Sequence, residues 1–187
     1  LFRHIPQAVH MHILIVGNMG YVGPVVSRHL RARFPDAHIT GYDSGLFAHC
    51  LTGSGSFPET VLDFQYFRDV RDCTPDVLRG VDAVIYLAAI SNDPMGQQFE
   101  AVTDAVNRQG CLSFARMAAD AGVRHFALAS SCSVYGLASS APRTEQDDTN
   151  PLTAYARSKI AAEEDLASLK AGGMTITCLR FATACGF

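Results

Sequence analysis

The sequence predicts an α/β fold in which a doubly wound parallel sheet of about six strands carries helices on both faces. Two observations lead to this fold. Short apolar runs alternate with longer helical patterns from His12 to Leu179, and parallel strands need crossover connections, which are usually helices. The chain has 187 residues, a length that suits one well-buried domain.

The expected strands are short and mostly apolar throughout, the pattern of strands buried on both faces. They are expected at 12–16, 39–42, 65–67, 83–87, 126–129 and 175–179. Helices are expected at 20–34, 75–79, about 98–121 and 153–169. In the third of these, apolar and small residues recur at steps of four from Val102 to Ala118, with Gly110 at the centre.

Composition argues against several classes of partner. The net charge is −3 and no basic stripe is present, which disfavours nucleic acids and anionic membranes. The longest apolar run, Ala83 to Ile90, is far shorter than the roughly 20 residues of a membrane span. The six cysteines form no CxxC pair and no metal-ligand spacing, so we expect reduced thiols, no metal and a cytoplasmic protein.

The first functional motif is the segment GNMGYVG, Gly17 to Gly23, between the first strand and the first helix. Glycines in that position allow a tight turn, a close approach of the backbone to a pyrophosphate, and close helix packing. The helix start then presents unpaired N–H groups to the phosphates. An ordinary glycine-rich turn is the alternative, but the preceding strand and the following helix favour a dinucleotide loop formed by Gly17, Gly20, Tyr21, Val22 and Gly23.

Asp43 follows the second strand, twenty residues beyond Gly23. A carboxylate there can accept both ribose hydroxyls of NAD and would repel the 2′-phosphate of NADP. Ser44 and Gly45 supply no cation for that phosphate. These features favour NAD over NADP. A turn-forming role of Asp43, which also fits Asp-Ser-Gly, is the alternative.

Tyr155 and Lys159 form a YxxxK motif on an expected helix, which places both side chains on one face, one turn apart. A free tyrosine has a pKa of about 10 and is a poor base at neutral pH. A nearby ammonium and a positively charged nicotinamide both favour the phenolate. The spacing also occurs by chance, as a buried tyrosine beside a lysine that reaches solvent.

Ser131 lies in the segment SSCSVYG, residues 130–136, directly after the fifth strand. Open α/β sheets bind their ligands at this edge, and a serine there can hold a reacting alcohol. A serine that caps its own backbone is the alternative. The glycine loop, the ribose acid, the serine and the Tyr/Lys pair occur in the order that one reaction mechanism requires, so together they favour catalysis.

These residues give residues 11–187 a close resemblance to the extended short-chain dehydrogenases/reductases, the NAD-dependent epimerase/dehydratase family that includes UDP-glucose 4-epimerases. The matching segments are GNMGYVG, GYDSG, DVRD, YLAAIS, SSCSVYG, PLTAYARSK and LRFATACG, with Asn107 followed by Gly110. The resemblance implies a Rossmann fold, NAD as cofactor, and a catalytic set of Ser131, Tyr155 and Lys159. It also implies that further residues line the cofactor: Asp69, Val70, Leu87, Ala88, Ala89, Asn107, Ala129 and Phe181, besides Asp43 and the loop.

The resemblance further implies a nucleotide-sugar substrate and a homodimer formed through the helices at about 98–121 and 152–170. Residues 1–10 are interpreted as a tag or an upstream extension. Residues 11–187 then form the NAD-binding domain, and most of the C-terminal substrate-binding lobe is expected to be absent from this chain.

The expected activity is epimerisation of a nucleotide sugar through a transient 4-keto intermediate, with Tyr155 as the base. Two features depart from relatives in the family. Dehydratases carry Asp-Glu where this chain has Cys132-Ser133, which disfavours dehydration, and Thr183 stands where related epimerases often have Asn. A keto-sugar-nucleotide reductase or dehydrogenase remains an alternative, as does a non-catalytic NAD-binding protein.

Overall fold

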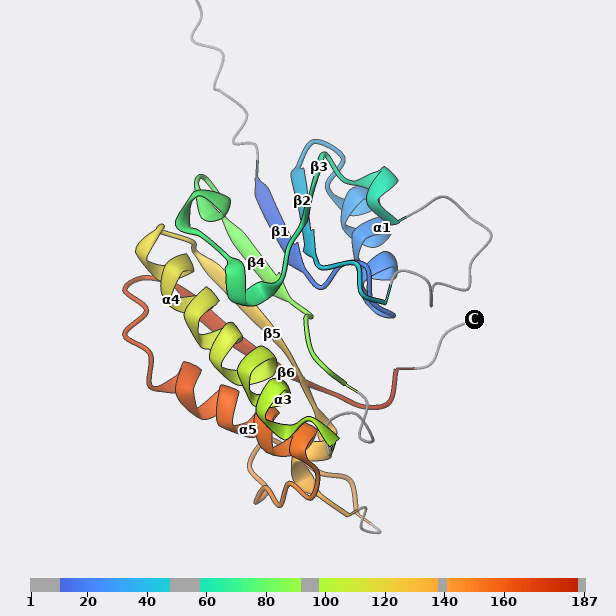
Figure 1. Cartoon of the computed structure of the whole chain (residues 1–187), viewed down its shortest axis with the longest axis vertical. Helices are drawn as coiled ribbons and strands as arrows, with labels where there is room; N and C mark the ends of the chain where they lie inside the picture. Colours follow the sequence, from blue (N-terminus) through green and yellow to red (C-terminus); the bar gives the residue numbers. More distant parts are fainter. Residues whose placement is uncertain (1–10, 48–57, 92–97, 138–140, 185–187) are drawn as a thin grey trace, which may run out of the picture.

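A single parallel sheet of six strands organises the computed structural model, which describes residues 11–47, 58–91, 98–137 and 141–184 (Figure 1). The strand order is β3-β2-β1-β4-β5-β6, the order of a doubly wound dinucleotide-binding sheet. The strands are β1 (His12–Val16), β2 (His38–Asp43), β3 (Phe64–Phe67), β4 (Ala83–Tyr86), β5 (His125–Ser131) and β6 (Thr175–Phe181). The predicted fold class is therefore confirmed.

The topological switch point lies at β1, which pairs with β2 on one side and with β4 on the other. The chain winds outward in one direction to β3 and then returns to build β4, β5 and β6. In open α/β sheets, ligands bind at the carboxyl edge beside such a switch point.

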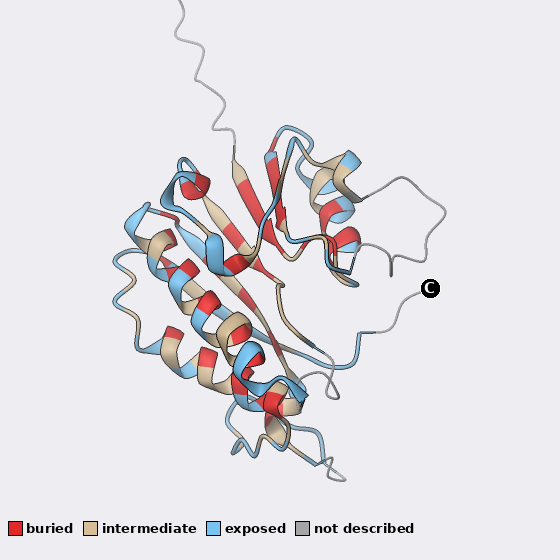
Figure 2. Cartoon of the chain, viewed as in Figure 1, coloured by how far each residue is buried: buried red, intermediate tan, exposed pale blue. Residues whose placement is uncertain are grey.

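Helices cover both faces of the sheet, and each face has its own core (Figures 1 and 2). Helix α1 (Gly23–Arg33) packs Val26 and Leu30 near Ile13 and Ile15 of β1. The other face is covered by α3 (Glu100–Asp104), the π-helix η5 (Ala105–Gly110), α4 (Cys111–Asp120) and α5 (Ala154–Ala167). Its larger core contains Leu14 and Val16 of the same strand, because successive strand side chains point to opposite faces.

Helix boundaries differ from the prediction mainly at the first helix. Helix α1 begins at Gly23 rather than at residue 20, because the preceding residues form the turn out of β1. The helix expected at 75–79 is the 3-10 helix η4 (Pro75–Leu78). Three further 3-10 helices were not predicted: η2 (Pro58–Val61), η3 (Val70–Asp72) and η6 (Cys132–Tyr135).

The helix expected at about 98–121 contains a wider turn, the π-helix η5. Because a π-turn changes the angular spacing of side chains, the step-of-four stripe does not stay on one face. Val102 is 41% exposed whereas Gly110 is buried. A β-carbon on Gly110 would lie 3.2 Å from a methyl group of Val70 and 3.7 Å from the Tyr86 hydroxyl. Gly110, the centre of the predicted stripe, therefore faces the sheet and not an outer surface that another subunit could meet.

Within the described part of the chain, no helix is long and apolar enough to cross a membrane. The same residues contain no cluster of three histidine, cysteine or acidic side chains that could hold a metal ion. Four cysteines in this part are free thiols, namely Cys73, Cys111, Cys132 and Cys178. Cys50 and Cys185 lie outside the described residues.

Candidate cofactor-binding and catalytic site

The glycine loop leaves β1 at Gly17, whose N–H donates to the Tyr42 carbonyl at 2.8 Å. Gly17 has φ +86°, and a β-carbon there would lie 2.5 Å from the Ala88 nitrogen. A β-carbon on Gly23 would lie 2.2 Å from the Asn18 carbonyl oxygen. The fold itself therefore requires both glycines, for a left-handed turn and for close packing.

Gly20 differs from its two neighbours in the motif. A β-carbon there would meet only the Gly17 carbonyl oxygen, at 3.5 Å, which is ordinary contact. No packing within the described protein explains this glycine. Close approach of a ligand to the backbone would explain it, as the prediction from the motif requires.

The N-terminus of α1 is suited to an anion. Its N-cap residue, Val22, makes no side-chain cap, and the first turn holds no acidic residue. Its N–H groups therefore keep their hydrogen-bonding capacity and the positive end of the helix dipole. Tyr21 lies at the same end with its side chain 64% exposed. These features fit the pyrophosphate of a dinucleotide.

Asp43, at the end of β2, accepts hydrogen bonds from two backbone N–H groups. One oxygen accepts from Met19 at 2.9 Å and the other from Gly45 at 2.8 Å. The first bond ties the glycine loop to β2 and the second forms the local turn, so the turn-forming interpretation holds. Each carboxylate oxygen can accept more than one hydrogen bond, so the same geometry leaves capacity for ribose hydroxyls.

Two features near Asp43 were missed from the sequence. Asn18 is fully buried, and its amide pairs with Gln65 of β3 at 2.7 Å, which anchors the loop from a second side. Phe67, the register partner of Asp43 on β3, is 61% exposed at the same edge. No sequence signal relates these pairs, because their members lie 24 and 47 residues apart.

The segment after β4 is held by Asn107. Leu87 and Ala88 donate to the Val16 carbonyl at 2.7 and 3.0 Å, which keeps them beside the glycine loop. The Asn107 side chain is fully buried in η5 and bonds both the N–H and the carbonyl of Ile90, at 2.8 and 3.1 Å. Asn107 therefore fixes the course of the segment predicted to pass the cofactor.

Asn107 also links this segment to the helix that carries Tyr155. Its amide donates to the Ser158 hydroxyl at 3.0 Å, and that hydroxyl donates to the Tyr155 carbonyl at 2.7 Å. Ser158 was not predicted. It lies inside the YxxxK motif at a position that the motif leaves variable.

Helix α5 places Tyr155 and Lys159 one turn apart, with the lysine Nζ 5.7 Å from the centre of the phenol ring. Lys159 is 1% exposed, and its ammonium donates to the Ala129 carbonyl at 2.7 Å. Burial lowers the pKa of Lys159 to about 8. An ammonium has three N–H donors, and this acceptor uses one of them.

Ser131 ends β5 and is half-buried. Its Oγ accepts the N–H of Ser133 at 3.2 Å and so caps η6, as the alternative interpretation expected. Its own hydroxyl proton remains a donor for an alcohol. The glycine loop after β1 and Ser131 at the end of β5 thus both lie at the carboxyl side of the parallel sheet, where η6 packs against α5.

The remaining predicted cofactor residues are less directly placed. The Asp69 carboxylate accepts two hydrogen bonds from the Arg71 guanidinium, at 2.9 and 2.7 Å. These bonds lower the pKa of Asp69. Val70 is 8% exposed and Phe181 is 40% exposed at the end of β6. Contacts of Asp69, Val70, Ala89 and Phe181 with a cofactor remain predictions.

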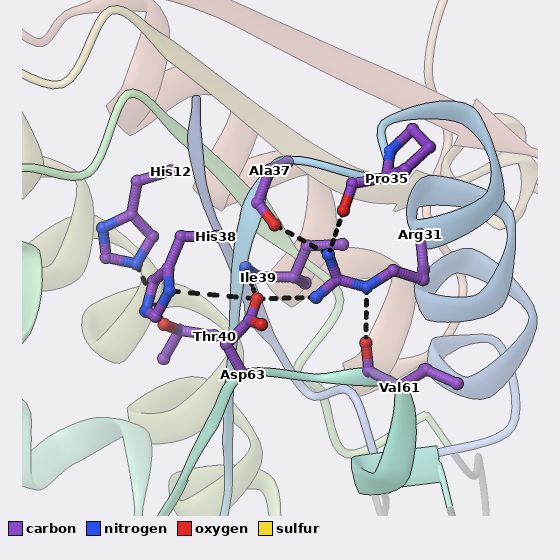
Figure 3. A network of polar contacts seen from close by, with 9 residues as sticks. All are labelled: His12, Arg31, Pro35, Ala37, His38, Ile39, Thr40, Val61 and Asp63. Carbon is purple, nitrogen blue, oxygen red and sulfur yellow. Dashed lines mark hydrogen bonds and ion pairs between the residues drawn. The ribbon is translucent and has the colours of Figure 1, made fainter. Parts of the chain in front are cut away.

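The opposite, amino edge of the sheet carries a separate polar network (Figure 3). Arg31 donates to the carbonyls of Val61, Pro35 and Ala37 at 3.0, 2.9 and 2.8 Å. It also pairs with the Asp63 carboxylate at 2.6 Å. The Ile39 N–H donates to the same carboxylate at 2.7 Å. The network was not expected from the sequence.

Two histidines extend the network toward β1. The His38 Nδ1 lies 3.8 Å from Asp63, and the His12 and His38 rings pack edge to face with centroids 4.5 Å apart. The His12 Nε2 forms a hydrogen bond with Thr40 at 2.9 Å. They adjoin a hollow of about 200 Å³ that reaches Arg79 and Tyr66.

Comparisons with known proteins identify the family of this chain. The NAD dependent epimerase/dehydratase family matches residues 13–187. A UDP-glucose 4-epimerase from Lactobacillus helveticus is 28% identical over 182 residues, which cover 94% of this chain and 52% of the relative. A UDP-glucose 4-epimerase from Rhizobium meliloti gives the same identity over 179 residues, again 52% of its length. The chain thus spans about half the length of these curated relatives.

Solved structures show the same fold. A UDP-glucose-4-epimerase from Stenotrophomonas maltophila, with bound NAD and formylated UDP-arabinopyranose, superposes with a TM-score of 0.77 at 26% identity, covering 91% of this chain and 52% of that one. An NAD-dependent NDP-hexosamine 5,6-dehydratase of tunicamycin biosynthesis gives 0.78 at 24% identity, over 91% and 54%, which supports the fold alone. With its family profile matched along almost its whole length, the chain belongs to the NAD-dependent epimerase/dehydratase family.

Proposed function

We propose that the whole protein is an NAD-dependent epimerase of a nucleotide sugar. One observation carries this proposal: a phenol and a fully buried ammonium lie one helical turn apart, 5.7 Å from Nζ to ring centre, at the same side of the sheet as an uncapped phosphate loop. A protein that only binds a dinucleotide has no use for that pair.

Each residue of the catalytic set has a role that its surroundings allow. The Tyr155 phenolate takes the proton of the sugar 4-hydroxyl and returns a proton when the alcohol is formed again. The Lys159 charge favours the phenolate, and its remaining N–H donors suit the nicotinamide ribose. The Ser131 hydroxyl donates to the oxygen of the reacting alcohol and orients it.

The cofactor fits the loop that precedes α1. The backbone at Gly20 leaves space for a pyrophosphate, and Asp43 has acceptor capacity for ribose hydroxyls, which favours NAD over NADP. When bound, NAD supplies the hydride acceptor and donor that interconversion of an alcohol and a ketone requires. Leu87 to Ala89 and the Ala129 region border the path of the dinucleotide in this proposal.

Epimerisation is favoured over dehydration by the residues after Ser131. Dehydration needs an acid to expel a hydroxyl as water, and this chain offers the exposed thiol of Cys132 and the hydroxyl of Ser133. A net reductase remains the nearest rival. It would consume the reduced cofactor stoichiometrically, whereas an epimerase leaves the absorbance at 340 nm unchanged as product accumulates.

The test is turnover of UDP-glucose and UDP-galactose by the whole protein and by the Tyr155→Phe variant, with products separated by chromatography. We expect the variant to lose activity by about 10²–10⁴-fold, the usual contribution of a general base, with nearly unchanged NAD affinity. Tyr66→Phe, on β3, is the matched control. Full turnover by Tyr155→Phe would remove Tyr155 from the mechanism, and steady loss of absorbance at 340 nm with reduced cofactor would favour the reductase.

We also propose a homodimer and a cytoplasmic location, both implied by the family resemblance. The helices α4 and α5 pack side by side on one face of the sheet (Figure 1). Phe99 and Val102, at the start of α3, which leads into α4 through η5, are 48% and 41% exposed. We propose that this layer meets its copy in a partner subunit. Light scattering on the purified whole protein tests this, with a mass of one subunit as the contrary result.

A further inference from the structure

A second set of polar side chains adjoins the predicted catalytic residues along β5 and α5 and was not predicted from the sequence. Its centre is Glu163 of α5, whose side chain is 11% exposed. The Arg180 guanidinium of β6 pairs with it at 2.7 Å, and the Ser130 hydroxyl of β5 donates to it. Arg180 also donates to the Tyr135 hydroxyl at 2.8 Å. One carboxylate thus joins a helix to two strands.

This cluster is contiguous with the catalytic set along both elements. On α5, Glu163 lies one turn beyond Lys159, as Lys159 lies one turn beyond Tyr155. On β5, Ser130 stands between Ala129, whose carbonyl accepts the Lys159 ammonium, and Ser131. The end of β5 is therefore fixed to α5 by two neighbouring hydrogen bonds, one to Lys159 and one to Glu163.

Glu163 is also the carboxylate that acts on the buried ammonium. The ionisable groups around Lys159 are Cys111 from α4, Cys178 from β6, and Tyr155 and Glu163 on its own helix. Burial raises the pKa of Cys111 to about 12 and that of Cys178 to about 11, so both thiols are neutral at neutral pH. Among the described residues that act on Lys159, Glu163 supplies the negative charge.

We propose that Glu163 is a positioning residue: held by Arg180 and Ser130, it supplies the charge that keeps Lys159 an ammonium beside Tyr155 and fixes the end of β5 that carries Ser131. The role for Tyr155 rests on the proposed function. The charge relation between Glu163 and Lys159 does not, and it can be measured without substrate.

The Lys159 ammonium can be observed directly, and this chain holds one other lysine, Lys170. In the whole protein labelled with ¹³C-lysine, the Lys159 signal is assigned by its absence in Lys159→Met and its pKa is read by NMR titration. Glu163→Gln is compared with Glu164→Gln, the same change at the next, exposed position of α5. We expect Glu163→Gln to lower the pKa of Lys159 by about one unit or more, and Glu164→Gln to leave it unchanged.

Glu163→Gln leaves the Arg180 charge uncompensated and could prevent folding, so a second variant provides an independent test. Glu163→Gln with Arg180→Gln removes both charges. We expect its Lys159 pKa to lie between those of the wild type and of Glu163→Gln. If Glu163→Gln does not fold, the double variant decides: a pKa equal to that of Glu164→Gln overturns the proposal.

The pH dependence of turnover connects this charge to the reaction. The alkaline limb of the profile should move to lower pH in Glu163→Gln, together with the Lys159 pKa, whereas a purely structural role would lower turnover at all pH values. An unchanged Lys159 pKa refutes the positioning role even if Tyr155 proves essential. A shifted pKa with full activity in Tyr155→Phe refutes the proposed mechanism instead.

Discussion

The two edges of the sheet use polar side chains in opposite ways. At the amino edge, Arg31 distributes its donors among three carbonyls and Asp63, and Asp63 in turn accepts from Ile39. At the carboxyl edge, as far as the described residues show, Lys159 is fully buried with one acceptor, the N-terminus of α1 has no side-chain cap, and no packing explains the glycine at position 20.

The difference separates stability from function. A buried ion with few partners lowers the stability of the fold. Such a destabilising group is typically found where function requires it. A network in which each charge is paired and hydrogen-bonded stabilises the fold instead. We therefore expect substitutions at the amino edge to change stability and to leave turnover unchanged. Substitutions at the carboxyl edge should change turnover or ligand affinity.

The glycine loop contains both kinds of position, and it provides the largest expected effect. Gly17→Ala must adopt a left-handed backbone and meet the Ala88 nitrogen, so we expect the free energy of unfolding to fall by about 3 kcal/mol or more. Gly20→Ala has neither problem, so its free energy of unfolding should stay within about 0.5 kcal/mol of the wild-type value. The same substitution should weaken the binding of NAD. Urea unfolding and NAD titration measure the two effects. A destabilised Gly20→Ala with normal NAD affinity would contradict the assignment.

The next effect concerns the buried ammonium. Its pKa is lowered in the folded state, so between pH 8 and 10.5 the unfolded chain binds more protons and stability rises with pH. Lys159→Met removes the cost of burying the charge. We expect it to raise the free energy of unfolding at pH 7 by about 1–3 kcal/mol and to abolish turnover. A variant that is both inactive and less stable would assign Lys159 a structural role.

The amino edge should respond in the opposite sense. Asp63→Asn removes the ion pair with Arg31 and weakens the bond from the Ile39 N–H. Because Asp63 is 39% exposed, solvent screening limits the loss of stability to about 1 kcal/mol. Turnover and NAD affinity should not change. Asp148→Asn, at an exposed carboxylate, is the control. A loss of turnover in Asp63→Asn as large as that of a carboxyl-edge variant would contradict the distinction between the edges.

Local sequence patterns predicted most of this fold and less of the site. All six strands were predicted because each is a short apolar run between turn residues, and Tyr155 and Lys159 were found because helical spacing is local. The π-helix around Asn107 was not predictable, since the hydrogen-bond partners of Asn107, Ile90 and Ser158, lie 17 and 51 residues away in the sequence. The interactions of Glu163 were not predictable, because its partners Arg180 and Ser130 lie on strands, 17 and 33 residues away. A carboxylate on a helix is also usually exposed to solvent.

The smallest expected effect is the pH response of the amino edge. Burial lowers the pKa of His12, the nearby His38 lowers it further, and Asp82 and Asp63 oppose both. The contribution of neutral His12 to stability is therefore fully present above pH 6.5. It falls as the pH drops toward the folded-state pKa of His12, because the unfolded chain then binds more protons than the folded chain. We expect a loss below about 1 kcal/mol, reduced in His12→Gln. An unchanged acid response in this variant would place the titrating group elsewhere.

A crystal structure of the protein with NAD tests the contrast between the edges most directly. We expect the pyrophosphate against the backbone at Gly20 and the start of α1, and the nicotinamide ribose within hydrogen-bond distance of the Lys159 ammonium. A dinucleotide bound in the hollow beside His12 and His38, with Gly20 and Lys159 untouched, would contradict the account.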